Sequence, residues 1–320
     1  MMTALVGDIG GTNARFALWQ DQQLECIRVL PTKEFPTPED AVRAYLDDIG
    51  ASVDALTAVC LACAGPVGGD EFRFTNNRWV LSRSNFSRNL GLDDLLLIND
   101  FAAMALGMTR LQPDERICVR QGEGEPGRPC LVIGPGTGLG VATLLSLPGG
   151  WMALPGEGGH ICLPVGSERE AALWTYVHRQ IGHVNAEAIL SGGGLLNLYR
   201  ASCALDGCEA TLDSPAQVTA SALAGDRYAE AVLEQFCTWL GRVAGDNVLT
   251  VGARGGVYIV GGVVPRFADF FLRSGFDAAF SDKGGMSRYL DGIPVWLVTA
   301  EYPGLEGAGV AVQQVLAGRR

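Results

Sequence analysis

Two glycine-rich turns, each between apolar runs, contain the residues best suited to hold an anion. The first lies in LVGDIGGTNARFALW at residues 5–19 and the second in GPGTGLG at residues 134–140. Around Gly10, Gly11, Thr12 and Asn13, successive backbone N–H groups would form a concave phosphate site, since glycine has no Cβ to hold a phosphate away. An ordinary hairpin is the alternative for either turn alone, but two such turns in one chain favour phosphate binding.

The sequence around these turns excludes two common phosphate motifs. GDIGGT matches neither the P-loop pattern nor GxGxxG, and the residues after it, NARFALW, indicate a strand. Both motifs require the N-terminus of a helix at that point, where the phosphate binds. The sequence therefore predicts a strand–turn–strand phosphate loop.

Asp8 lies where the first predicted strand enters its turn. A carboxylate beside phosphates is repulsive unless a cation lies between them, so Asp8 is a candidate for contacting Mg2+ through water. The alternative is an aspartate that only stabilises an Asx-type turn.

A buried strand, LLLIND at residues 95–100, ends abruptly in Asn99 and Asp100. In α/β sheets, ligands bind beyond the carboxyl ends of strands, where these side chains would project. An aspartate there can accept the proton of a hydroxyl that attacks phosphorus. The alternative is that Asp100 only caps the following helix, FAAMALG.

A Pro- and Gly-rich loop, LPGEGGHICLP at residues 154–164, presents Glu157 and His160 on a constrained backbone. Further on, Glu187 is expected to open a helix with Asn185 as its cap. The alternatives are a glutamate that only complements a helix dipole and a loop histidine without a ligand. With three histidines in the chain and no matching cysteine spacing, no zinc site is expected.

The elements that must position these residues alternate between strand and helix patterns, which favours an α/β fold. Residues 4–19 predict two strands around the first turn, and ALTAVCLACAGPV predicts a buried strand. Helices are predicted over 168–181 and 226–244 and near the C-terminus. The apolar faces of the first two comprise Leu173, Trp174, Val177 and Ile181, and Tyr228, Val232, Phe236, Leu240 and Val243.

The two glycine turns also share a spacing. Gly7 and Gly134, and likewise Gly11 and Gly138, superpose at an offset of 127 residues. This weak repeat suggests two similar halves. The polar, turn-rich segment 120–129 is the predicted junction between them.

Composition bounds the kind of protein. The chain has 320 residues, enough for about two domains. Its net charge of −11, without a basic cluster, argues against nucleic acid as a main partner. The start lacks a signal-peptide pattern, no apolar stretch is long enough to span a bilayer, and nine cysteines are scattered through the chain, so we expect a reduced, cytoplasmic protein without membrane partners. Cys60 and Cys63, although spaced as CxxC, are expected to be buried strand residues.

Together these segments resemble the bacterial glucokinases, sugar kinases of the superfamily of hexokinase, actin and the heat-shock chaperones. VGDIGGTNARFAL is similar to the first phosphate loop of that family, GPGTGLG to the second, and YIVGGVVPRF (258–267) to the adenosine segment. On the sugar side the similar segments are AGPV (64–67), FTNNRW (74–79), LINDF (97–101), PGEGGH (155–160) and AEAILSGGGL (186–195).

The resemblance implies ATP-dependent phosphorylation of D-glucose at its 6-hydroxyl, with Mg2+, as a step that feeds glycolysis. Asp100 would be the general base, and the sugar ligands would be Asn99, Glu157, His160 and Glu187. The nucleotide would be held by Asp8, Gly10, Gly11, Thr12, Asn13, Gly136, Thr137, Gly138, Gly261 and Gly262.

The implied fold is α/β and two-domain, of the ribonuclease-H-like (actin and hexokinase) type, with a cleft between the domains. Residues 1–110 plus 301–320 would form a small domain and residues 111–300 a large one, in a homodimer. The related ROK kinases carry clustered zinc-binding cysteines after their histidine. GGHICLPVGSE supplies only Cys162, so no zinc dependence is expected. A non-catalytic sugar-sensing regulator on the same fold is the alternative, disfavoured because the first strand begins by residue 4.

Overall fold

The computed structural model describes residues 3–65, 67–74, 77–92 and 95–318. The chain divides into two compact units. One comprises Met1–Gln112, Leu147–Pro155 and Ala300–Arg320, and the other comprises Pro113–Ser146 and Gly156–Thr299. Each unit has its own sheet and its own hydrophobic core.

The first unit contains a five-stranded sheet in the order β3-β2-β1-β4-β7. Strand β1 pairs antiparallel with β2 and parallel with β4, and β7 extends the parallel half. Its strands and helices are β1 (Thr3–Ile9), β2 (Asn13–Gln20), β3 (Gln23–Pro31), α1 (Pro38–Asp48), β4 (Ala58–Cys63), β5 (Glu71–Arg73), β6 (Val80–Ser82), α2 (Arg83–Leu90), β7 (Leu95–Asn99), α3 (Asp100–Gly107) and α10 (Pro303–Ala317).

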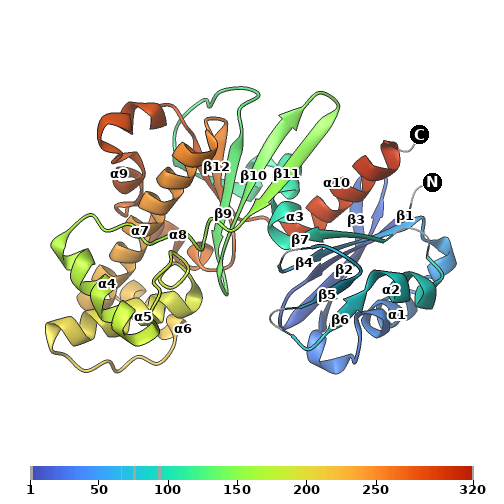
Figure 1. Cartoon of the computed structure of the whole chain (residues 1–320), viewed down its shortest axis with the longest axis horizontal. Helices are drawn as coiled ribbons and strands as arrows, with labels where there is room; N and C mark the ends of the chain where they lie inside the picture. The colour runs from blue at the N-terminus through green and yellow to red at the C-terminus, as the bar shows by residue number, and fades with distance from the viewer. Residues whose placement is uncertain (1–2, 66, 75–76, 93–94, 319–320) are drawn as a thin grey trace. The chain divides into compact units, whose positions relative to one another are not determined.

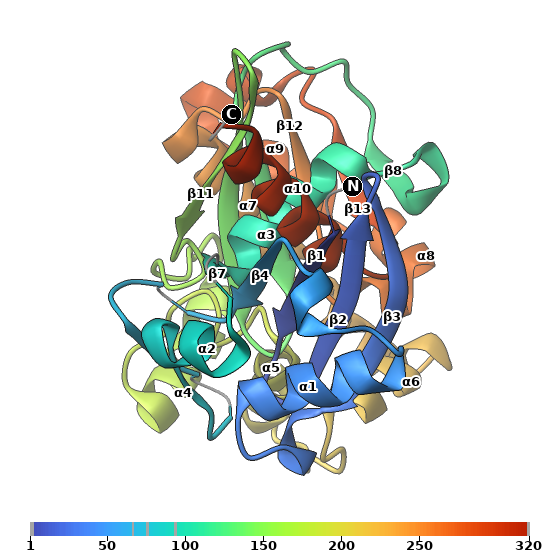
Figure 2. The same cartoon turned by 90° about the vertical axis from the view of Figure 1, so that its right-hand side faces the viewer.

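Helices α1 and α2 cover one face of this sheet, and α3 and α10 cover the other (Figure 1 and Figure 2). Alternation along β2 explains both layers. Phe16 packs against Tyr45 of α1, whereas Trp19 lies on the opposite face, where α10 approaches so closely that a Cβ at Gly309 would overlap its ring. Burying each such side chain contributes about 1.5–3 kcal/mol. As predicted, Cys60 and Cys63 are buried in β4.

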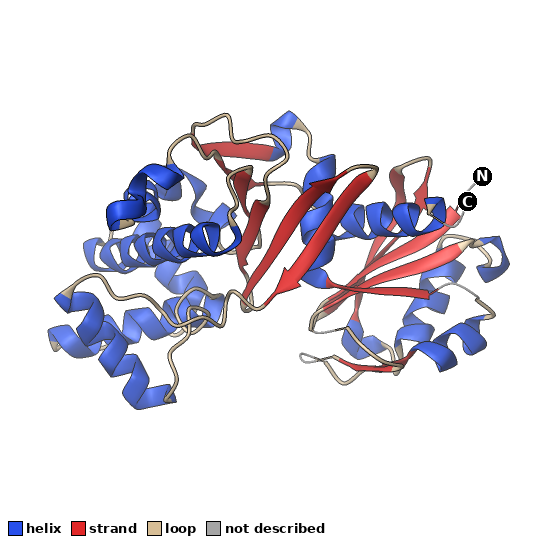
Figure 3. Cartoon of the chain, turned by 45° about the horizontal axis from the view of Figure 1, so that its top comes forward, coloured by secondary structure: helices blue, strands red, loops and turns tan. Residues whose placement is uncertain are grey.

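The second unit is built on a six-stranded sheet in the order β11-β10-β9-β12-β13-β8, although the edge strand β11 falls almost wholly within residues assigned to the first unit. Figure 3 shows its helices gathered beside its strands. The elements are β8 (Arg116–Arg120), β9 (Cys130–Pro135), β10 (Leu139–Leu147), β11 (Gly150–Gly156), α4 (Glu168–Ile181), α5 (Gly192–Asp206), α6 (Pro215–Leu223), α7 (Arg227–Val251), β12 (Gly256–Ile259), α8 (Ala268–Leu272), α9 (Phe276–Ser281) and β13 (Val295–Val298).

The two predicted helices of this unit are confirmed as α4 and α7. Asp226 caps α7, and its Oδ1 accepts hydrogen bonds from the N–H groups of Tyr228 and Ala229. The predicted apolar faces are largely buried. Ile181 is the exception, because it is the last residue of α4 and remains 50% exposed.

The repeat suggested by the glycine spacing has a structural counterpart. Strand β9 pairs antiparallel with β10 and parallel with β12, as β1 pairs with β2 and β4. Both glycine turns therefore follow a central strand that has one antiparallel and one parallel neighbour.

The prediction that segment 120–129 joins two halves is wrong. The segment lies wholly within the second unit, between β8 and β9. It is held there by Gly124 N–H to the carbonyl of Gly292 (3.0 Å) and by an ion pair between Glu125 and Arg254 (2.5 Å). Polar, turn-rich composition indicates a surface loop, and a surface loop need not be a domain boundary.

Helices long and apolar enough to cross a bilayer are absent from the part of the chain that the structure describes.

Candidate active site

The first glycine turn closes through a hydrogen bond from the N–H of Gly10 to the carbonyl of Asn13, 2.9 Å long. Thr32 fixes its carbonyl side, because its Oγ1 lies 2.9 Å from the oxygen of Gly11 and 3.1 Å from that of Thr12. The N–H groups of Gly11 and Thr12 form no hydrogen bond within the described ranges. The turn thus presents backbone donors outward, as an anion site requires.

Asn77 is a second anchor of this turn that the sequence analysis did not single out. Its Nδ2 donates to the carbonyl of Gly10 (3.1 Å), and its Oδ1 accepts from the N–H of Trp79 (2.8 Å). The signal was present in FTNNRW, although only as a family resemblance. Thr75 and Asn76 of that segment, and Pro66 of AGPV, lie outside the described residues.

The second glycine turn is closed by a hydrogen bond from Gly136 N–H to the carbonyl of Gly138 (2.8 Å). Oε2 of Glu187 accepts the N–H of Leu139 at 2.8 Å, and a Cβ at Gly138 would overlap that carboxylate. The N–H of Gly192 donates to the carbonyl of Gly136 (2.9 Å). Glu187, predicted as a sugar ligand, therefore also holds the second turn.

Two further N–H groups of this turn, those of Thr137 and Gly138, have no hydrogen-bond partner among the residues described here. The predicted adenosine segment, residues 258–267, lies beside β9, the strand that leads into this turn. Gly261 has φ +87°, and a Cβ there would approach the carbonyl oxygen of Pro135 to 2.5 Å, so only glycine fits without strain. Gly262 follows on the exposed surface.

Asp8 lies within β1, opposite Arg15 in β2, and Arg15 Nη1 is 3.4 Å from its Oδ2. Because Asp8 lies within a strand, the alternative that it only stabilises an Asx-type turn is wrong. Burial raises the pKa of the Asp8 carboxyl from its usual 3.8, and the nearby Arg15 only partly offsets this. The N-terminus of α10 is adjacent, since a Cβ at Gly304 would lie 3.3 Å from the carboxyl group. Asp8 is thus a largely desolvated carboxylate that a cation would stabilise.

At the end of β7, Asn99 and Asp100 divide two roles between them. Asn99, not Asp100, caps α3, because its Oδ1 accepts the N–H of Ala102 (3.0 Å). Its Nδ2 donates to Oδ1 of Asp100 (3.1 Å) and to the carbonyl of Gly65 (3.2 Å). Oδ1 of Asp100 also accepts the N–H of Phe101 (3.0 Å). The Asp100 carboxyl group is therefore oriented by the Asn99 amide and the Phe101 N–H, while Asn99 holds the N-cap position of α3.

Glu157 and His160 lie in one exposed loop of the second unit. The N–H of His160 donates to the carbonyl of Glu157 (2.9 Å), and His160 Nε2 is 3.8 Å from Oε2 of Glu157. The side chain of His160 is 51% exposed and that of Glu157 is 69% exposed. A donor beside an acceptor on the surface can bind a hydroxyl group, which both donates and accepts.

A short ladder joins this loop to the segment of Glu187. Glu187 N–H donates to the carbonyl of Gly159 (2.9 Å), and Cys162 and Asn185 form an antiparallel bridge. The expectation that Glu187 opens a helix is wrong. Residues 187–189 form a hydrogen-bonded turn, and the helix α5 begins only at Gly192, because Ser191 supplies the cap.

The structure therefore gathers the predicted residues in two groups, one in each unit. In the first unit, the turn at 10–13 is accompanied by Asp8, and Asn99 is hydrogen-bonded to Asp100. In the second, the turn at 136–138 is tied to Glu187, whose segment also pairs with the loop of His160.

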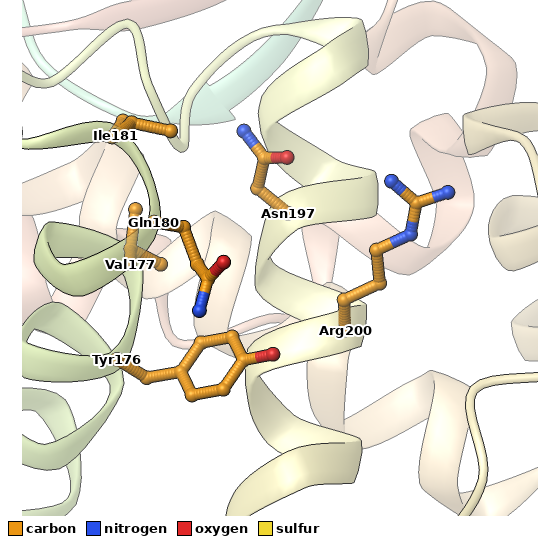
Figure 4. Close-up of a pocket in the computed structure, with 6 residues that line it drawn as sticks. All are labelled: Tyr176, Val177, Gln180, Ile181, Asn197 and Arg200. Atoms are coloured by element: carbon orange, nitrogen blue, oxygen red, sulfur yellow. The ribbon is translucent and has the colours of Figure 1, made fainter.

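A cavity of about 180 Å³ lies elsewhere in the second unit, between α4 and α5 (Figure 4). It is smaller than the roughly 300–1,000 Å³ typical of small-molecule sites. Its lining residues are Tyr176, Val177, Gln180, Ile181, Asn197 and Arg200, and none of them belongs to the predicted site.

Comparison with known proteins identifies the family to which the chain is similar. The family model for glucokinase matches residues 5–315. A glucokinase of Pseudomonas aeruginosa (strain LESB58) is 59% identical over 314 residues, which are 98% of this chain and 95% of that relative. The crystal structure of a glucokinase from an Antarctic psychrotroph has a TM-score of 0.88 at 36% identity and covers 98% of this chain and 99% of its own.

A glucokinase of Balamuthia mandrillaris, crystallised in complex with glucose, has a TM-score of 0.81 and covers 97% of this chain and 94% of its own. At 23% identity it shows likeness of fold alone. With the preceding match, this likeness confirms the predicted two-domain α/β fold of the actin and hexokinase type.

Proposed function

The chain belongs to the glucokinase family, and on that premise we propose that it transfers the terminal phosphoryl group of ATP to the 6-hydroxyl of D-glucose. The observation that carries the mechanism is the placement of Asp100. Its carboxyl group stands at the carboxyl end of β7, oriented by the Asn99 amide and the N–H of Phe101.

Asp100 is the proposed general base. Accepting the proton of the 6-hydroxyl makes that oxygen a better nucleophile toward phosphorus, and such catalysis contributes about 10²- to 10⁴-fold. Two donors fix the carboxyl group, so less orientational freedom is lost when the hydroxyl binds.

The proposed sugar ligands are Asn99, Glu157, His160 and Glu187. They provide an amide, two carboxylates and an imidazole, which match the alternating donor and acceptor character of sugar hydroxyls. Most of the barrier in phosphoryl transfer is overcome by positioning and charge neutralisation, so holding one hydroxyl in line is their main task.

The two glycine turns are the proposed phosphate sites, with Gly261 and Gly262 against the adenosine. In each turn two backbone N–H groups, at residues 11–12 and 137–138, are unused by the described part of the chain. Backbone donors suit an acidic protein of net charge −11, which has no broad positive field for attracting nucleotide.

Asp8 fits a magnesium ion held through water. Within the described ranges no cluster of three or more His, Cys, Asp or Glu side chains could hold a metal on its own. Magnesium commonly needs only one or two carboxylates in addition to waters and substrate phosphates, and the desolvated Asp8 carboxylate provides one. When bound, magnesium supplies positive charge that offsets that of the phosphate oxygens.

We further propose that residues 1–110 plus 301–320 and residues 111–300 act as small and large domains of a cytoplasmic homodimer. The proposed role in the cell is to supply glucose 6-phosphate to glycolysis. Light scattering of the purified protein tests the dimer directly.

The function is tested by measuring ADP formation with ATP, magnesium and a panel of hexoses. We expect ADP with glucose, in equal amount to glucose 6-phosphate. Absence of ADP with every sugar would overturn the proposal and favour a non-catalytic sugar-binding regulator.

A further inference from the structure

Asn185 lies beside His160, and both ends of its side-chain amide are engaged. Its Oδ1 accepts the N–H of Ala188 at 2.9 Å, and its Nδ2 lies 2.8 Å from Nδ1 of His160. The contact with Ala188 fixes the orientation of the amide, because a backbone N–H can only donate and must therefore face the oxygen. The NH2 group is left facing the imidazole.

This orientation determines which ring nitrogen of His160 carries the proton. An amide NH2 group only donates, so Nδ1 must accept, and the proton of the neutral ring lies on Nε2. A proton on Nδ1 would place two donors face to face at 2.8 Å.

The backbone around this contact holds both partners in place. The N–H of Ala186 donates to the carbonyl of Ile161 (2.8 Å), next to the bridge between Asn185 and Cys162. On the other side, Nδ2 of Asn197 in α5 donates to the carbonyl of Ala188 (3.2 Å). The contact between Asn185 and His160 therefore lies in a segment that is held by hydrogen bonds on both sides.

We infer that Asn185 is a positioning residue for the phosphorylation reaction: it fixes His160 as the Nε2–H tautomer and so makes it a hydrogen-bond donor to the sugar. The inference rests on the proposed function, in which His160 contacts glucose. Nε2 lies 3.8 Å from Oε2 of Glu157. A sugar hydroxyl can accept from Nε2–H and donate to the Glu157 carboxylate, which a ring protonated on Nδ1 alone would not allow.

The direct test is the tautomer itself. In protein labelled with 15N-histidine at about pH 8.5, above the range in which histidines usually gain a proton, two-bond 1H–15N spectra distinguish the two tautomers. The chain has only three histidines, so comparison with His160→Gln assigns the signal. We expect the Nε2–H pattern for His160. An Nδ1–H pattern for His160 in the wild-type protein would overturn the inference.

The functional test uses Asn185→Asp, which keeps the shape of the side chain and an oxygen for Ala188 but replaces the donor facing His160 with an acceptor. We expect the signal to change to Nδ1–H and KM for glucose to rise about 10-fold, the effect of losing one hydrogen bond. KM for ATP should stay nearly unchanged.

The matched control is Gln180→Glu on the exposed surface of α4, which introduces the same charge in the same unit but does not contact His160 or Asn185. We expect it to leave the tautomer and KM for glucose unchanged. An equal rise in KM in both variants, with the tautomer unchanged, would show a merely structural role and contradict the inference. A wild-type protein without any glucose phosphorylation would instead overturn the proposed function and leave the tautomer result intact.

Discussion

The two glycine turns share a topology but are anchored by different chemistry. The first is held through its carbonyl groups, by the Thr32 hydroxyl and the Asn77 amide, both of which are uncharged. The second is held by the carboxylate of Glu187, which accepts the N–H of Leu139, and by the N–H of Gly192, which donates to the carbonyl of Gly136. The half-buried carboxylate of Asp8 also lies near the first turn, but its partner is Arg15 in the adjacent strand.

Because of this difference, the shaping of the loop and the binding of sugar are assigned to different residues at the first turn but share a residue at the second. At the first turn, the groups that shape the loop are distinct from Asn99, a proposed sugar ligand, and from Asp100, the proposed general base. At the second turn, one residue, Glu187, both shapes the loop and is proposed to bind sugar. Changes at the second turn should therefore affect both substrates, whereas changes at the first should affect mainly the nucleotide.

Among changes that compare the two turns, the largest effect is expected from a matched pair of glycine substitutions. In Gly138→Ala the new Cβ would overlap the Glu187 carboxylate, so the turn must shift, whereas in Gly10→Ala it meets only the carbonyl oxygen of Asn13 at 3.3 Å. A displacement of about 1 Å costs about 100-fold in rate. We expect kcat/KM for glucose to fall by about that factor in Gly138→Ala and much less in Gly10→Ala, measured by a coupled ADP assay. Equal losses would remove the distinction between the turns.

A smaller effect should separate the two roles of Glu187. In Glu187→Gln the amide oxygen can still accept the N–H of Leu139, but the charge is lost, so KM for glucose should rise about 10- to 100-fold with KM for ATP nearly constant. Glu187→Ala removes both roles and should raise both KM values. If Glu187→Ala left KM for ATP unchanged, Glu187 would have no part in shaping the phosphate loop.

The smallest effect concerns the half-buried carboxylate near the first turn. Because burial raises the pKa of Asp8 above its usual 3.8, its contribution to stability is present below that value and is lost as the pH rises through the folded-state pKa. Asp8→Asn should therefore be more stable than the wild-type protein at pH 7 without ligands, with the difference fading toward low pH. Activity should fall with the loss of the magnesium contact.

Thermal melting of both proteins from pH 7 down to low pH, at constant ionic strength, measures this difference in stability. Asp54→Asn, on an exposed 3-10 turn, controls for the change in net charge. A destabilised Asp8→Asn at pH 7 would mean that the ion pair with Arg15 outweighs the cost of burial.

The sequence was sufficient for those features that depend on local pattern. Both glycine turns were predicted as strand–turn–strand loops, because branched and aromatic residues follow the first turn, and β1–β2 and β9–β10 confirm this. The helix over 168–181 was also predicted with its bounds. Even the pairing of Asp8 with Arg15 has a local signal, since the two lie seven residues apart across one hairpin.

Contacts between distant segments could not be predicted in this way. Asn77 reaches Gly10 from 67 residues away, and Glu187 reaches Leu139 from 48 residues away. The cap of α3 illustrates a subtler limit. Asn99 and Asp100 are both good caps by residue type, and only the backbone decides that Asn99 takes the N-cap position.

The most direct test of the account is the turnover of Asp100→Asn and Asp100→Ala compared with their affinity for glucose. Asp100→Asn keeps an oxygen for the N–H of Phe101, so the start of α3 is preserved and only the basic group is lost. The account predicts that kcat falls about 10²- to 10⁴-fold in both variants, while glucose binding, measured by calorimetry, persists. Turnover close to that of the wild-type protein in either variant would contradict the assignment of Asp100 as the general base.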